Sequence, residues 1–178
     1  MTNDLSEQQK LQLQNVKLAV FDVDGVLTDG HLNFLPDGQE VKSFNTLDGL
    51  GIKLLSQAGI ETAIITGRRS PQVEKRAQSL GINYLHQGRE DKLIALQELW
   101  QKTGHCAEQT AYIGDDLPDL AAIRAVAFGA TVNGGHPFVL KHADWCTTRI
   151  AGQGAGREFC ETILAAQNRL EQLYSEYL

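Results

Sequence analysis

The sequence predicts an α/β fold, a doubly wound, Rossmann-like parallel sheet with a β-hairpin inserted after the first strand and no cap domain. Short apolar runs typical of buried strands alternate with segments of helical periodicity. Repeated strand–helix–strand units of this length are typical of a parallel sheet with helices on both faces. The 178 residues are 42% hydrophobic and 21% charged, so we expect one domain over residues 1–178.

Turn and cap signals separate the elements of the first half. The run 36–38 (Pro-Asp-Gly) is a turn signal between two short strand patterns, which predicts a hairpin. Gly59 and Gly81 end two helical patterns, and Ser70 with Pro71 begins the second of them. The expected elements are a strand over 17–22, the hairpin over 31–44, a helix over 48–59, a strand over 60–66, a helix over 70–81 and a strand over 82–87.

The second half repeats the alternation and ends in a helical tail. The expected elements are a helix over 89–104, a strand over 110–114, a helix over 117–126, a strand over 127–131, a short helix over 136–143 and a strand over 144–148. In the tail, 151–178, we expect one continuous helix from Arg157 onward, because apolar residues recur at spacings of four and three.

Composition and charge exclude several classes of protein. A net charge of −6 argues against a nucleic-acid binder, because phosphate contacts need a basic surface. The first residues contain no apolar run flanked by positive charge, and no apolar run approaches the roughly 20 residues of a membrane span, so we expect no signal peptide and no membrane contact. Cys106, Cys146 and Cys160 lack the spacing of a zinc site or a disulfide framework. We therefore expect a cytoplasmic protein.

Acidic residues follow two of the predicted strands where each strand ends. Asp22 and Asp24 follow the first strand, and Asp115, Asp116 and Asp119 follow the strand over 110–114. In doubly wound sheets, ligands bind outside the carboxyl ends of the strands. An isolated Asp is more often a turn or helix cap, but five acids at two strand ends indicate a functional site.

Carboxylates without a neighbouring His predict a hard, all-oxygen metal site, for which Mg²⁺ is the expected ion. A phosphoryl group bound there has its charge offset by the metal, by Lys92 and by the Thr66 hydroxyl. Asp22 is then placed to act as nucleophile. Asp24, two residues on, is placed to act as general acid for the leaving alcohol and as base for water.

The motifs "DVDGVLTDG", "TGR" and "GDDLPD", with Lys92 between the last two, resemble in order the four motifs of the haloacid dehalogenase superfamily of phosphatases. The resemblance implies that Asp22 is the nucleophile, and that Asp24 is the acid/base with its backbone carbonyl on the metal. It also implies that Asp22 and Asp115 bind Mg²⁺, for which Mn²⁺ or Co²⁺ can substitute.

By the same resemblance, Thr66 and Lys92 hold the phosphate, while Asp116 and Asp119 support the metal ligands through water or hydrogen bonds. Most relatives carry a cap domain in one of two gaps between motifs. Here the first gap holds only the hairpin and one helix, and the second only a helix and a strand.

A short capless chain with "PDGQE", "NTLDGLGIKLL" and "AGQGAGREFCE" resembles the phosphatases of 3-deoxy-D-manno-octulosonate 8-phosphate, which serve lipopolysaccharide biosynthesis. A small acidic sugar phosphate needs cations and helix N–H groups near its carboxylate. The residues expected at the substrate are Asp24, Asn45, Thr46, Leu47, Asp48, Gly49, Lys53, Gly67, Arg68, Arg76, Lys92 and Arg157. A nonulosonate 9-phosphate as substrate and a non-enzymatic phospho-receiver domain stay open as alternatives.

We expect a homotetramer, because a capless site needs cover and a lone hairpin is barely stable in water. The apolar hairpin residues are Leu32, Phe34, Val41 and Phe44. Hairpins from several subunits then pair into a shared barrel, as in the tetramers of the family that the chain resembles. The apolar stripe of the tail leaves two interpretations open. It packs on its own sheet, or the glycines in 152–156 let it reach a neighbouring site.

Overall fold

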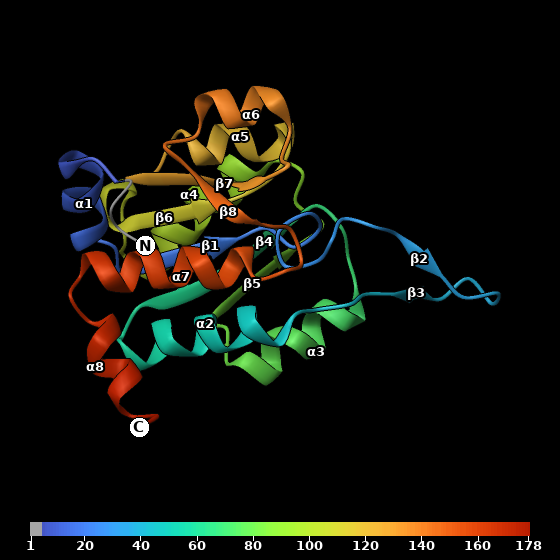
Figure 1. Cartoon of the computed structure of the whole chain (residues 1–178). Helices are drawn as coiled ribbons and strands as arrows, with labels where there is room; N and C mark the ends of the chain where they lie inside the picture. The colour runs from blue at the N-terminus through green and yellow to red at the C-terminus, as the bar shows by residue number, and fades with distance from the viewer. Residues whose placement is uncertain (1–4) are drawn as a thin grey trace.

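The computed structural model describes residues 5–178 and shows a six-stranded sheet covered by helices on both faces (Figure 1). The strands lie in the order β5–β4–β1–β6–β7–β8, and all neighbouring strands run parallel. Their bounds are β1 Leu18–Phe21, β4 Glu61–Thr66, β5 Tyr84–Gln87, β6 Thr110–Ile113, β7 Phe128–Asn133 and β8 Trp145–Ile150. The predicted doubly wound parallel sheet is confirmed.

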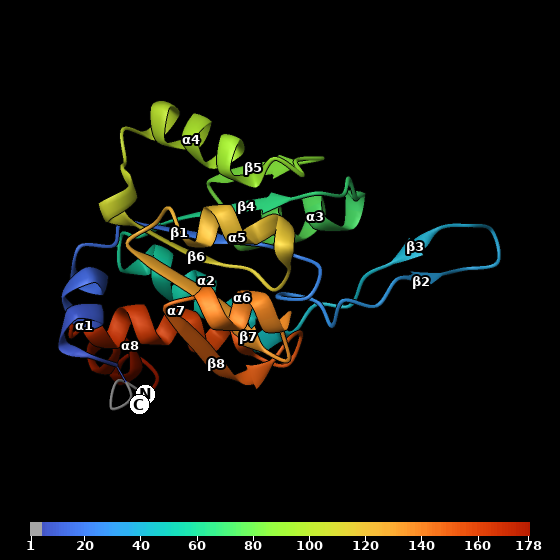
Figure 2. The same cartoon turned by 90° about the horizontal axis from the view of Figure 1, so that it is seen from above.

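Two helical layers bury opposite faces of this sheet (Figure 2). In β1, Ala19 and Phe21 belong to the larger core cluster, while Leu18 and Val20 belong to the other, as the alternation of a strand requires. The first layer holds α1 Glu7–Gln14, α2 Thr46–Gln57, α3 Pro71–Leu80, α7 Ala155–Ala166 and α8 Leu170–Ser175. The second holds α4 Lys92–Thr103, α5 Leu117–Ile123 and α6 Pro137–His142, and a 3₁₀ turn spans Ala107–Gln109. No helix within residues 5–178 is long and apolar enough to cross a membrane.

The predicted hairpin is present and projects away from the sheet (Figures 1 and 2). It pairs β2 Asn33–Phe34 with β3 Glu40–Val41 in antiparallel register. Only this hairpin lies between β1 and α2, and only α3 and β5 lie between β4 and α4, so neither connection contains a cap domain. The assignment of the whole chain to one domain stays a prediction.

The tail differs from the expected continuous helix. α7 begins at Ala155, and the chain leaves the helix after Ala166, where Asn168 has a φ of 58° in the left-handed region. Phe159 and Ile163 are fully buried against the sheet of the same chain. The first of the two interpretations of the stripe therefore holds for α7, because its apolar face covers its own core.

One helix lies in a segment to which no element was assigned. Helix α1 begins with a capping box, in which the Ser6 hydroxyl and the Gln9 side chain each bind the other's backbone N–H. The spacing Ser-x-x-Gln was the readable signal for this helix. Ser70 occupies the expected cap position of α3, but its hydroxyl donates to Gln72 instead of capping the helix.

Candidate active site

Polar residues from the ends of β1, β4 and β6 meet at one cavity of about 370 Å³. β1 lies between β4 and β6, where the strand order reverses, so the residues that follow these strands share one edge. The cavity is lined by Asp22, Asp24, Gly30, Thr66, Gly67, Arg68, Glu90, Lys92, Asp115, Asp116, Pro118 and Asp119. A larger cavity of about 420 Å³ lies beside α1, but among residues 5–178 Glu108 is the one ionisable residue that lines it. The chemistry therefore favours the cavity at the strand ends.

Three carboxylates converge in this cavity. Oxygen atoms of Asp22, Asp115 and Asp119 lie within 4.8 Å of one another. Burial and the charge of Asp119 raise the pKa of Asp22 well above its usual range, and they raise the pKa of Asp115 to about 6. Among residues 5–178, Lys92 is the one ammonium in contact with this group, so three acidic side chains share a single basic partner. This oxygen-only donor set, with more acids than basic partners, fits a divalent cation such as Mg²⁺.

Lys92 is the buried cation of the site. Its side chain is 5% exposed, and its Nζ lies 2.8 Å from Asp22 Oδ1 and 2.6 Å from Asp119 Oδ1. Burial acts to lower the pKa of Lys92, but the charges of Asp22 and Asp119 outweigh burial and raise it. The ammonium is therefore charged at neutral pH and holds the two carboxylates in fixed orientations.

Asp119 organises this cluster from the first turn of α5. Its Oδ1 accepts hydrogen bonds from Lys92 and from the Tyr112 hydroxyl, the latter at 2.8 Å, and its Oδ2 accepts from the backbone N–H of Asp116. The Asp116 carboxylate instead caps α5 through the N–H of Leu117, so it lies outside the group of three. Sequence reasoning missed Tyr112. Its signal was a hydroxyl in a buried strand, which needs a partner.

Gly25 lets the loop after β1 pass against Asp115. It has a φ of +95°, a conformation that favours glycine, and a Cβ at this position would lie 2.2 Å from Asp115 Oδ2. Any larger residue would therefore displace the Asp115 carboxylate. This contact explains why a glycine follows the second acid of the "DVDG" motif.

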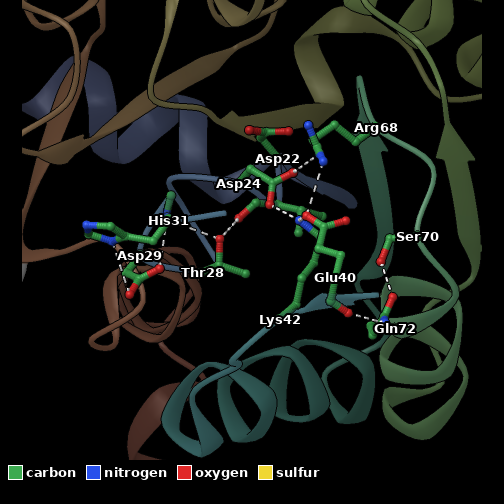
Figure 3. A network of polar contacts seen from close by, with 12 residues as sticks. Asp22, Asp24, Thr28, Asp29, His31, Glu40, Lys42, Arg68, Ser70 and Gln72 are labelled. Atoms are coloured by element: carbon green, nitrogen blue, oxygen red, sulfur yellow. Dashed lines mark hydrogen bonds and ion pairs between the residues drawn. The ribbon is translucent and has the colours of Figure 1, made fainter. Parts of the chain in front are cut away.

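The Asp24 carboxylate is not part of the group of three carboxylates, because it contacts the stem of the hairpin (Figure 3). It pairs with Lys42, and Arg68 Nε lies 4.0 Å from its second oxygen. Glu40 completes the cluster by pairing with both cations. Lys42 and Glu40 were missed at the sequence level, because charged residues in an exposed hairpin pattern carry no signal for such contacts.

The expected substrate residues fall into separate places. Asp24, Gly67, Arg68 and Lys92 line the main cavity. Asn45 and Thr46, at the start of α2, line another cavity of about 340 Å³ together with residues of the hairpin stem and of the loop before α7. The structure therefore does not join the start of α2 to the main cavity within one chain.

Other residues of that set lie on the surface or between helices. Leu47 and Lys53 of α2 are exposed. The Arg76 guanidinium donates to the Asn45 carbonyl at 2.9 Å, and a Cβ on the buried Gly49 would meet that same guanidinium. These side chains contact protein groups or solvent, and their substrate contacts stay predictions.

Asp48 and Arg157 join α2 to α7. Asp48 is 2% exposed, and one of its oxygens accepts the N–H of Arg157 at 2.7 Å. The Arg157 guanidinium pairs with Glu161 on its own helix. The start of α7 has Gly154 as its N-cap, which has no side chain to bind the free N–H groups, so Asp48 takes that role from another helix. The substrate contacts expected of Asp48 and Arg157 also stay predictions, because this arrangement does not provide them.

Asp48→Asn is expected to stabilise the protein at high pH. Burial raises the pKa of Asp48 to about 6, so the folded state binds its proton more tightly than the unfolded state, where the pKa is near 4. The ionised carboxylate then lowers the free energy of unfolding above pH 6, and this loss disappears as the pH falls toward 4. The Asn oxygen still accepts from Arg157. We expect a gain of about 1–2 kcal/mol at pH 8 and little change at pH 4.5.

Urea unfolding of both proteins at the two pH values measures this difference. Asp37→Asn, at the exposed hairpin turn, is the matched control and should show no comparable pH-dependent gain. A variant Asp48→Asn that loses more stability at pH 8 than at pH 4.5 would contradict the assignment.

Comparison with known proteins finds close similarity over almost the whole chain. Residues 86–157 match the family model of haloacid dehalogenase-like hydrolases. The 3-deoxy-D-manno-octulosonate 8-phosphate phosphatase KdsC of Escherichia coli K12 is 42% identical over 159 residues, which are 89% of this chain and 85% of that protein.

Solved structures of phosphatases are also similar to this chain, both in sequence and in fold. A probable YrbI family phosphatase from Pseudomonas syringae is 54% identical with a TM-score of 0.95, covering 97% of this chain and 98% of that one. The Moraxella catarrhalis phosphatase, in complex with magnesium ion, phosphate ion and KDO, is 44% identical with a TM-score of 0.94 over 96% and 98% of the two chains. A cobalt-bound phosphatase from Haemophilus influenzae is 40% identical with a TM-score of 0.88 over 92% and 99%.

Proposed function

The chain belongs to the KdsC family of haloacid dehalogenase-like hydrolases, and from this premise we propose that it hydrolyses 3-deoxy-D-manno-octulosonate 8-phosphate to the free sugar acid and phosphate. The observation that carries the proposal is the buried Asp22 carboxylate, held by Lys92 at the floor of a polar cavity beside two further carboxylates. The reaction serves lipopolysaccharide biosynthesis, and the expected cytoplasmic location is part of this proposal.

Asp22 attacks the phosphate ester in the first half of the reaction. One carboxylate oxygen forms a bond to phosphorus as the bond between phosphorus and the sugar oxygen breaks, and the electron pair of that bond goes to the sugar oxygen. Asp24 gives its proton to this oxygen, which leaves as the alcohol. The products of this step are the free sugar acid and an aspartyl-phosphate on Asp22.

Water releases the phosphate in the second half. Asp24, now ionised, accepts a proton from the water that attacks phosphorus, and the bond to Asp22 breaks with its electrons returning to the carboxylate. Lys92 and Thr66 bind the phosphoryl oxygens during both halves, since both line the cavity beside Asp22. The enzyme returns to its starting state with Asp24 protonated.

The residues proposed to hold Mg²⁺ are Asp22, Asp115 and the backbone carbonyl of Asp24. Bound there, the ion neutralises carboxylate and phosphoryl charge, which is most of what phosphoryl transfer requires. Asp119 supports this site through Lys92, and Asp116 supports it by capping the helix that carries Asp119. Mn²⁺ or Co²⁺ can substitute.

Steady-state phosphate release from a panel of sugar phosphates tests this function. The panel contains 3-deoxy-D-manno-octulosonate 8-phosphate, a nonulosonate 9-phosphate and neutral hexose phosphates, each with Mg²⁺. We expect the highest kcat/KM for the first compound. A higher value for the nonulosonate ester would change the substrate, and a single phosphorylation without turnover would instead support the phospho-receiver alternative.

We further propose that the active form is a homotetramer joined through the hairpins. Leu32, Phe34, Leu35 and Val41 of the hairpin are 47%, 60%, 47% and 42% exposed, which is unfavourable in water without a partner. Phe34→Asp is therefore expected to shift the protein to smaller species in sedimentation velocity. Leu11→Asp, an equally exposed position on α1, should leave the assembly unchanged. A fully active monomer at assay concentration would refute the proposal.

A further inference from the structure

We propose that Lys42, on the hairpin stem, is a positioning residue that holds the Asp24 carboxylate in place for proton transfer to the leaving oxygen. The inference rests on the proposed function, in which Asp24 is the acid and base. It makes the hairpin part of the catalytic machinery within a single chain, separate from any role in assembly.

The contact between Lys42 and Asp24 is a partly buried ion pair, in which the Lys42 side chain is the buried partner (Figure 3). The Lys42 side chain is 2% exposed, although it belongs to the segment that leads out to the projecting hairpin. Lys is almost never buried this completely unless it is paired, because removing an ammonium from water is costly. Its Nζ contacts Asp24 Oδ1 and lies 3.2 Å from Glu40 Oε1, so both of its partners are carboxylates.

Lys42 and Arg68 hold different oxygens of Asp24. Arg68 Nε lies 4.0 Å from Asp24 Oδ2, and its Nη2 lies 3.2 Å from Glu40. Two basic and two acidic side chains thus form one cluster of contacts. The Arg68 side chain is 44% exposed, and exposed ion pairs contribute little. The buried Lys42 is therefore the contact that fixes the direction of the Asp24 side chain.

The backbone that carries Lys42 is itself tied to the body of the protein. Gln72 Nε2 on α3 donates to the Glu40 carbonyl at 2.7 Å, and the Ser70 hydroxyl donates to the Gln72 side chain at 2.7 Å (Figure 3). The hairpin stem is thus anchored beside the cavity, while its tip projects away from the sheet (Figure 1). Lys42 reaches Asp24 from a fixed element, as a positioning group requires.

A structural role for Lys42 and a positioning role predict different kinetics. Structural damage lowers kcat/KM for every phosphate ester by a similar factor. A misplaced Asp24 instead lowers kcat/KM most for the esters whose leaving oxygen most needs a proton. The quantity kcat/KM reports only the steps up to departure of the leaving group, so the second half of the reaction does not obscure the comparison.

The experiment measures kcat/KM for p-nitrophenyl phosphate, phenyl phosphate and a simple alkyl phosphate with the full chain and Mg²⁺. The variants are Lys42→Met, Lys42→Arg and Asp24→Asn, with Lys141→Met on α6 as the exposed control. For Lys42→Met we expect a loss of about 10–100-fold on the phenyl and alkyl esters and less than about threefold on p-nitrophenyl phosphate. Asp24→Asn should show the same trend with larger losses. Lys42→Arg should retain most of the wild-type kcat/KM on the phenyl and alkyl esters.

An equal loss on all three esters would overturn the inference, as would unchanged kinetics in Lys42→Met. Sedimentation of each variant shows whether assembly has changed, and the selectivity among esters is unaffected by such a change. A wild-type protein that releases no phosphate from the sugar phosphates would refute the proposed function. If the wild-type enzyme turns over the sugar phosphates but Lys42→Met loses kcat/KM by the same factor on all three esters, this inference alone is refuted.

Discussion

Asp22→Asn is expected to lower phosphate release by at least about 10⁴-fold, the loss typical of removing a nucleophile. An amide oxygen does not form the acyl-phosphate, although the Asn side chain has nearly the same shape and still accepts a hydrogen bond from Lys92. The fold should be kept. Burial and the charge of Asp119 already make an ionised Asp22 unfavourable, so its removal should not lower the melting temperature of the metal-free protein.

Initial rates with the sugar phosphate, together with thermal unfolding, test this prediction. Asp91→Asn, an exposed Asp outside the cavity, is the matched control and should retain full activity. Near-normal turnover by Asp22→Asn in the presence of Mg²⁺ would disprove the aspartyl-phosphate mechanism.

Removal of the metal should abolish activity completely and reversibly. Oxygens of Asp22, Asp115 and Asp119 lie within 4.8 Å of one another, and Lys92, which contacts Asp22 and Asp119, is a single basic partner for three acids. A dianionic phosphate ester cannot approach this group without further positive charge. We therefore expect no turnover after treatment with EDTA and full recovery on adding Mg²⁺.

Asp115→Ala should behave like the metal-free enzyme even with Mg²⁺ present. Thermal unfolding gives an independent measure, because Mg²⁺ at 100 times its Kd stabilises the native state by about 2.7 kcal/mol. Mg²⁺ should raise the melting temperature of the wild type and of Asp91→Asn, and raise it much less for Asp115→Ala. Full activity after exhaustive chelation would refute the metal requirement.

The parallel sheet was predictable because its signals are local. The apolar run before Asp22 and the run before Asp115 each contain enough hydrophobic residues to identify a buried strand without knowledge of its neighbours. Gly81 and Gly104 end helices in the left-handed conformation that few other residues adopt. The acids that follow the strands were predictable as one site for the same reason, since parallel strands present their carboxyl ends at one edge.

The details of the site depended on partners far away in the sequence. Lys92 and Asp119 are separated by 27 positions, and Lys42 and Asp24 by 18. Which side chain meets which depends on the strand order and on the orientation of each helix, neither of which periodicity encodes. The supporting role of Asp119 was expected, but its contact with Lys92 was not specified, and Tyr112 and Lys42 were not foreseen.

The sequence by itself determined the fold class, the hairpin and the identity of the acids at the strand ends, because strand and helix patterns, turn residues and caps act over a few neighbouring residues. Only the tertiary structure decided that α7 packs on its own sheet, that Asp48 binds the start of α7 across 109 positions, and that the hairpin stem meets Asp24. An apolar stripe or a charged side chain specifies what kind of partner it needs. Which partner it finds depends on how the whole chain packs.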